Sequence, residues 1–175
     1  MYWEGDFYKC LSQFHFIASM NEKNLLFSAI KSGQDSQVEK LLKANPQLVT
    51  SKDDRAFTPL IFAAYFDKEA IVKTLIKHHA PVDGTDALGN TALIGVSFKG
   101  NVTLASYLLK HGAAINAINH NGVTPLIFAS MYNQTQMVEL LLKHQADISI
   151  MDNTGKMAID YAREKAFETI VTLLK

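Results

Sequence analysis

The chain has 175 residues, 48% of them hydrophobic and 19% charged, which is enough to bury a continuous core as one folded unit. Seventeen basic residues balance seventeen acidic ones, which argues against electrostatic capture of nucleic acid or of an anionic membrane surface. The single cysteine, Cys10, excludes an internal disulfide, and no segment approaches a membrane-spanning run, so we expect a cytoplasmic protein.

Residues 1–20 differ in composition from the rest of the chain. They hold the only tryptophan and six aromatic residues, and Phe7, Leu11, Phe14 and Ala18 fall on one stripe of a helix. One interpretation is a helix that covers the apolar face of the segment that follows. The other is an aromatic arm that binds a partner. Acidic residues near the start and the lack of an unbroken apolar stretch argue against a signal peptide.

The remainder of the chain repeats with a constant step of 33. Three glycines keep this step, at Gly89, Gly122 and Gly155. Chance would not hold four units in one frame, so the pattern indicates an array of repeated units. The aligned segments are TPLIFAAY (58–65), TALIGVSF (91–98), TPLIFASM (124–131) and MAIDYARE (157–164).

Each full unit predicts two helices. Thr58 can cap the first, because its hydroxyl accepts a backbone N–H, and Pro59 opens it, since proline has no N–H to lose there. Asp67-Lys68 ends that helix with residues suited to a turn. The second helices are expected where apolar residues recur at i, i+3 and i+4, over 71–76, 104–109 and 137–142.

An atypical unit precedes this array, and an incomplete one ends it. Leu26 and Ala29 match Leu60 and Ala63 with a step of 34, so one extra residue falls in the connection at 45–49, where an insertion costs little. The chain stops inside the second helix of the last unit. Atypical terminal units are typical of repeat arrays, because their outer faces meet water.

A period of 33 with TPL at the start of each unit resembles the ankyrin repeat family. The resemblance implies an all-α fold, a solenoid of stacked helix-turn-helix pairs with β-turn fingers that project as hairpins. It covers residues 21–175, which leaves residues 1–20 as an N-terminal aromatic extension or capping helix. Fingers are expected near 51–57, 84–90, 117–123 and 150–156. The repeats are expected at about 21–53, 54–86, 87–119, 120–152 and 153–175.

Departures from the family pattern locate weak points. The family carries a left-handed glycine after the second helix, where this chain has Asn45, His79, Gly112 and Gln145. Left-handed His79 and Gln145 should each cost about 1 kcal/mol relative to glycine. Met157 replaces the capping threonine, so the last pair is expected to fray most.

No group of residues in the sequence indicates an active site or a metal site. Equivalent histidines on successive units, such as His78 and His111, should lie about 10 Å apart, too far to share a metal ion. Cys10 and His15 would not share a helical face, so they do not suggest a nucleophile and base. We therefore expect neither catalysis nor a cofactor nor a bound metal.

The resemblance implies a concave groove lined by residues beside each finger glycine and at the end of each first helix. The middle units fill these positions with aromatic and apolar side chains, which form an exposed patch of the kind that monomers seldom keep without use. Two alternatives are that the N-terminal arm covers them or that some rings bury between repeats. The expected partner-binding residues are Arg55, Phe57, Tyr65, Phe66, Leu88, Phe98, His120, Met131 and Tyr132.

These features favour a monomeric, non-enzymatic module that binds a protein partner through the groove. One use is an adaptor that places the partner beside something else. The alternative is a stoichiometric inhibitor or immunity protein that blocks a partner enzyme or toxin, because small free-standing ankyrin-like proteins include toxin neutralisers. A structural role for a co-expressed enzyme is a third possibility.

Overall fold

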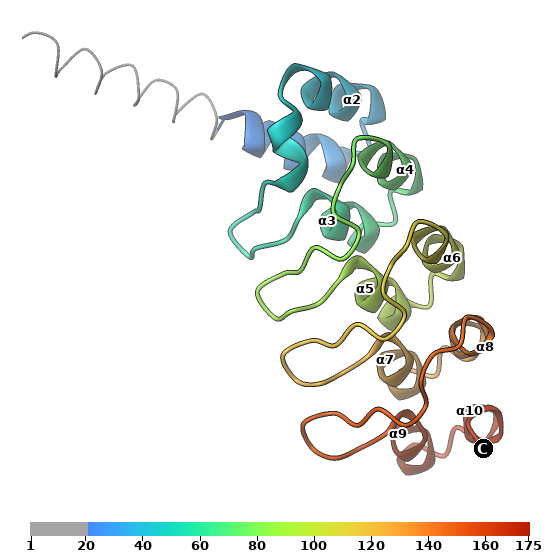
Figure 1. Cartoon of the computed structure of the whole chain (residues 1–175). Coiled ribbons are helices and arrows are strands. Elements are labelled where there is room, and N and C mark those ends of the chain that lie inside the picture. Colours follow the sequence, from blue (N-terminus) through green and yellow to red (C-terminus); the bar gives the residue numbers. More distant parts are fainter. Residues whose placement is uncertain (1–20) are drawn as a thin grey trace, which may run out of the picture.

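The computed structural model describes residues 21–175, which form a curved stack of helix pairs (Figure 1). Both interpretations of residues 1–20 lie outside the described residues. Within residues 21–175 the elements are helical and there is no β-strand, so the all-α prediction is confirmed. None of the described helices combines the length and the hydropathy needed to cross a bilayer.

The described helices fall into five pairs, as the repeat pattern predicts. Residues 21–32 and α2 (Asp35–Ala44) form the first pair. A 3-10 helix, η1 (Pro46–Thr50), occupies the longer connection and buries Leu48 and Val49, so this connection belongs to the core. The other pairs are α3 (Pro59–Tyr65) with α4 (Glu69–Lys77), α5 (Ala92–Lys99) with α6 (Val102–Lys110), α7 (Pro125–Met131) with α8 (Thr135–Lys143), and α9 (Ala158–Glu164) with α10 (Glu168–Leu173).

Threonine caps start three of the first helices, as predicted. Each hydroxyl satisfies a backbone N–H that would otherwise lack a partner in the first turn. In the last pair Met157 supplies no side-chain cap, but the Asp160 carboxylate accepts the Met157 N–H at 2.9 Å, which is one half of a capping box. The hydroxyls accept over 3.2–3.3 Å, Thr58 from Ile61, Thr91 from Ile94 and Thr124 from Ile127.

Left-handed residues end the helices. His79 and Gln145 both have φ 63°, as predicted for the position after the second helix. The same prediction for Asn45 is wrong, because its φ is −139° where the chain enters η1. The turns within the pairs are also left-handed, at Gly33, Asp67, Gly100, Asn133 and Ala166.

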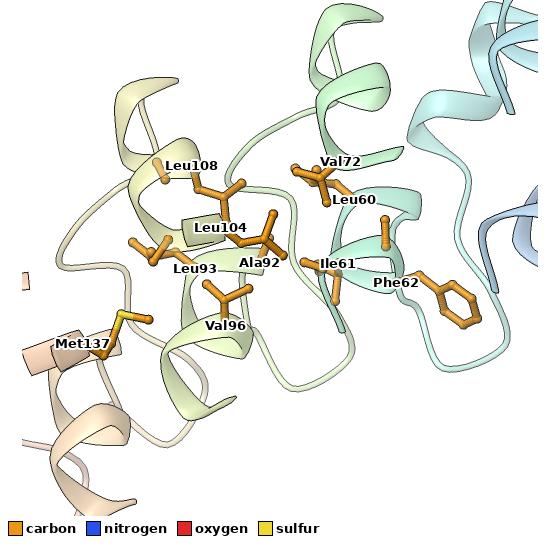
Figure 2. Close-up of a cluster of buried hydrophobic side chains, with 14 of the residues drawn as sticks. Leu60, Ile61, Phe62, Val72, Ala92, Leu93, Val96, Leu104, Leu108 and Met137 are labelled. Carbon is orange, nitrogen blue, oxygen red and sulfur yellow. The ribbon is translucent and has the colours of Figure 1, made fainter. Parts of the chain in front are cut away.

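The core runs along the stack. α3 packs on α5, α5 on α7 and α7 on α9, while α2 packs on α4, α6 on α8 and α8 on α10. Figure 2 shows Leu93 and Leu104 among the buried side chains between the helices that carry them. Small residues such as Ala63 and Ala129, both fully buried, let successive first helices approach closely. The first helices therefore lie side by side, with the fingers projecting from their N-terminal ends (Figure 1).

Candidate functional site

Four finger turns are each closed by one Asp or Asn side chain. The side-chain Oδ1 accepts the backbone N–H groups two and four residues further on, over 2.8–3.1 Å. The backbone N–H of the same residue donates to the carbonyl four residues further on, over 3.0–3.1 Å, so each finger is a tight turn with one hairpin-like backbone bond and without a β-strand. We did not predict this device, although its signal was an acidic or amide residue three positions before each left-handed residue. The residues are Asp53, Asp86, Asn119 and Asp152.

Neighbouring fingers are tied to one another. The His120 N–H donates to the Leu88 carbonyl at 3.0 Å, and the Asn153 N–H donates to the Asn121 carbonyl at 2.9 Å. Gly89 must be a glycine here: its φ is 77°, and a Cβ would lie 2.8 Å from the His120 ring. The last three fingers therefore form a hydrogen-bonded edge that holds the adjacent side chains in fixed positions.

The aromatic side chains predicted for the groove gather at the ends of the first helices. Tyr65, Phe98 and Tyr132 are 48%, 40% and 45% exposed, and Leu88 on the second finger is 61% exposed. Arg55 and His120 are also exposed on their fingers. The other predicted residues are half-buried and pack against the core, at Phe57, Phe66 and Met131.

These rings form two clusters. Phe57 lies 6.2 Å from Tyr65 between ring centroids, and Phe66 contacts Tyr65 at 5.2 Å. Phe98 meets Tyr132 in the next units. Leu88 lies between the clusters, lining the same hollow as Phe57, Tyr65 and Phe98. The structure thus brings most of the predicted residues together. His120 instead contributes its backbone to the finger edge.

Two lysines that the predicted set omitted bridge neighbouring first helices. Lys99 donates to the Tyr65 carbonyl at 2.7 Å and lies over the Tyr65 ring, 5.6 Å from its centroid. Lys165 donates to the Met131 carbonyl at 2.9 Å and lies 5.2 Å from the Tyr132 centroid. These ammonium groups complete the C-terminal ends of the preceding helices, where cations are favoured, and fix the rings beneath them.

Lys99 also forms an ion pair with Asp67. Partial burial raises the pKa of the Asp67 carboxyl, but hydrogen bonds from Lys99 and Asn101 lower that pKa by more, so the group remains ionised. The Lys99 ammonium is therefore engaged by both the Asp67 carboxylate and the Tyr65 carbonyl, and its role here is structural.

An open apolar hollow of about 300 Å³ lies between the two aromatic clusters. Gly95 of α5 lines this hollow. The equivalent positions in the units before and after it are occupied by aromatic residues, Phe62 and Phe128. The aligned segments already contained this difference, but it did not enter our prediction. The lining residues are Phe57, Ile61, Ala64, Tyr65, Asp86, Leu88, Asn90, Thr91, Ala92, Ile94, Gly95, Phe98 and Phe128.

The last unit has a polar surface instead. Burial raises the pKa of Asp152, but hydrogen bonds from Tyr161, Thr154 and Lys156 lower that pKa by more, to about 2. Lys156 pairs with Glu164 at 2.6 Å beside them. The aromatic surface of the middle units therefore gives way to charged residues toward the C-terminus.

The histidines have local roles. His78 lies 3.1 Å from Glu39, and His111 stacks against Tyr107 with ring centroids 4.2 Å apart. Within residues 21–175, no three histidine, aspartate, glutamate or cysteine side chains gather in a way that could hold a metal ion. The main feature of the described surface is therefore the row of aromatic rings at the ends of the first helices.

A comparison with protein-family models matches this chain over nearly all of the described residues. The model described as ankyrin repeats (3 copies) matches residues 25–119 and again residues 96–175. The two matches overlap within the middle units and together reach the end of the chain.

Proposed function

The chain belongs to the ankyrin repeat family, whose repeats are generally protein–protein interaction modules, and we propose that it binds a protein partner along its groove. The groove is the surface carried by the fingers and the ends of the first helices in the middle units. The single observation that supports this proposal most strongly is the exposure of Tyr65, Phe98 and Tyr132 on three successive units. Aromatic side chains dominate binding hot spots, and exposed clusters of them mark interaction surfaces.

The order of these rings also favours binding. Each of the three contacts a neighbouring ring, and lysines lie over Tyr65 and Tyr132. Side chains held in place before binding lose less conformational entropy when the partner docks. The groove therefore suits a stable protein complex better than a transient contact made by mobile side chains.

The proposal is a non-enzymatic role, because repeats of this kind are typically non-catalytic. We propose a monomer that acts in the cytoplasm as an adaptor. The alternative is a stoichiometric inhibitor or immunity protein that covers the active surface of an enzyme or toxin. An activity assay of the bound partner distinguishes the two, since an inhibitor abolishes activity at one equivalent and an adaptor leaves it intact.

The experiment that tests the groove is affinity capture with matched variants of the full chain. The bait carries Tyr65→Ala, Phe98→Ala and Tyr132→Ala together, and the control carries Lys73→Ala and Glu139→Ala on the second helices, where both side chains are exposed. A partner of the groove is captured by the wild type and the control and is lost from the triple variant. Equal capture by all three baits contradicts the proposal.

A further inference from the structure

The hollow at Gly95 exists because one ring is missing from a row of rings. Position 95 corresponds to Phe62, Phe128 and Tyr161 in the aligned units. A Cβ added to Gly95 would meet no atom of the described residues within 4 Å, and the residue lies inside α5. Neither the backbone nor a close neighbour requires glycine there. Its effect is to leave open a space at a position where the three aligned units carry an aromatic side chain.

The size and lining of the hollow fit one large apolar side chain. Its volume is about 300 Å³. A cavity of roughly 150 Å³ lined by apolar residues is enough to take up benzene. Phe57, Tyr65, Phe98 and Phe128 form aromatic walls, and Leu88 lies at the edge. An aromatic ring placed there would be surrounded by other rings, with which aromatic side chains favour edge-to-face or offset contacts.

Three polar side chains of the lining, those of Asp86, Asn90 and Thr91, are already engaged in hydrogen bonds. The Asp86 carboxylate accepts the N–H groups of Leu88 and Asn90 at 2.8 Å and the Asn90 side-chain amide at 3.1 Å. The side-chain Oδ1 of Asn90 accepts from the Asn119 side-chain amide at 2.9 Å, and the Thr91 hydroxyl accepts from the Ile94 backbone N–H. A charged or strongly polar group would lose its hydration here without gaining a new partner.

A cation stands beside the hollow. The Arg55 guanidinium lies 4.8 Å from the centroid of Phe57, a wall residue, and its side chain is 65% exposed. Among the described residues, its carboxylate neighbour is Asp53 at 3.9 Å, and the Asp53 Oδ1 already holds two backbone N–H groups. Unlike Lys99, Arg55 can therefore present its planar donors to an incoming carboxylate.

We propose that the Gly95 hollow receives one aromatic side chain of the partner protein, from a segment in which a carboxylate adjacent in sequence pairs with Arg55. The inference rests on the proposed groove and adds its chemistry: an acidic and aromatic segment in preference to a basic one. The missing ring of the second full unit is supplied by the partner, so binding completes the row of rings.

The test uses the full chain and a defined probe, the acetylated and amidated peptide Ser-Asp-Phe-Ser-Ser. Two matched peptides replace Phe by Ala or Asp by Asn. Titrations followed by amide chemical shifts are expected to show saturable changes at Ile94, Gly95 and Phe98. The Ala peptide should bind at least tenfold more weakly, since it no longer buries the apolar area of the ring. The Asn peptide should bind about two- to fivefold more weakly, as expected for an exposed ion pair.

Protein variants separate the two contacts. Gly95→Phe fills the hollow with the chain's own ring and should abolish the shifts, while Gly95→Ala, which leaves most of the space open, should bind within twofold of the wild type. Arg55→Gln lies on the exposed finger, keeps the fold, and should remove the preference for Asp over Asn. Undiminished binding by Gly95→Phe, or shifts that map away from α5, overturns the proposal.

Three further outcomes are distinguishable. If the peptide binds only after Trp3→Ala and Phe7→Ala, the chain's own N-terminal segment fills the hollow and the proposal of an external aromatic residue is wrong. With a captured partner, binding lost by Tyr132→Ala but kept by Gly95→Phe overturns this inference and leaves the groove standing. Binding kept by both variants removes both proposals.

Discussion

The phenyl ring of Phe98 meets the ring of Tyr132 edge to face, with centroids 4.5 Å apart and planes at 82°. The two residues come from the ends of successive first helices, and both remain partly exposed. Each ring therefore limits the rotamers of the other while one side of the pair faces solvent. This arrangement gives the groove an ordered apolar surface without burying it in the core.

We expect Tyr65→Ala, Phe98→Ala and Tyr132→Ala each to weaken binding of a captured partner at least tenfold, because a central aromatic contributes about 2 kcal/mol or more to an interface. Each substitution should lower the free energy of unfolding by no more than about 1 kcal/mol, which is the scale of one partly exposed ring pair. Isothermal titration and urea unfolding measure the two effects separately.

The matched controls for these variants are Lys73→Ala and Glu139→Ala, on the second helices. They should alter neither quantity. If the three groove variants unfold the protein, the rings are part of the core. If they bind the partner with unchanged affinity, the interface lies on another surface.

Gly95→Ala should stabilise the fold. Glycine inside a helix costs roughly 0.5–1 kcal/mol relative to alanine, and the added methyl group has space among the described residues. Urea unfolding should show a higher midpoint with an unchanged slope. The contrasting control is Gly89→Ala, which should destabilise, because its left-handed φ and the nearby His120 leave no room for a Cβ. A lower midpoint for Gly95→Ala would show that the glycine has a structural role.

Met157→Thr should stabilise the last pair by about 0.5–1 kcal/mol, because a hydroxyl at this position caps the first turn of the helix. The Asp160 carboxylate already accepts the Met157 N–H, so threonine would complete the capping box of α9. Hydrogen exchange of residues 158–173 should slow in the variant. The same gain in an Asp160→Ala background would show that the two halves of the box act independently.

Asp152 should make stability depend on pH in acid. Its native pKa of about 2 lies below its ordinary value of 3.8, so the folded state binds this proton less tightly than the unfolded chain. The stabilisation is complete well above pH 4 and is lost as the pH falls through 4 toward 2. Asp152→Asn, which copies Asn119 of the preceding finger, should be less stable than the wild type at pH 7.

The measurement for Asp152 is the free energy of unfolding in urea at pH 7, 4 and 2.5. The difference in the free energy of unfolding between the wild type and Asp152→Asn should become smaller as the pH falls. Tyr161→Phe should also make this difference smaller, because the Tyr161 hydroxyl donates to Asp152. A difference that stays constant with pH would mean that the carboxylate has an ordinary pKa in the folded state.

Much of the fold could be predicted because its determinants are local. Thr58 and Pro59 define a helix start within three residues, and the constant period places the same signal in the next units. Asn45 shows the limit of that reasoning. Its position in the repeat predicted a left-handed conformation. The chain instead enters η1 at this residue, because the side chains of η1 are buried in the core.

The candidate groove was predicted in outline only. Tyr65, Phe98 and Tyr132 were expected at the surface and are exposed, while Lys99 and Lys165 were not chosen although they hold two of these rings in place. A lysine that bonds to a carbonyl of the preceding unit leaves no signal in its own segment. Its role depends on the distance between neighbouring first helices.

The sequence by itself determined the repeat, the helix pairs and the exposed ends of the first helices, because caps and apolar periodicity act within one or two helical turns. The tertiary structure decided which side chains meet across units. In the sequence, Gly95 is simply a glycine within a predicted helix. When α3, α5 and α7 stack, the missing side chain leaves a hollow lined by Phe57, Phe98 and Phe128. Such a gap arises from the packing of separate helices, which no single segment of the chain contains.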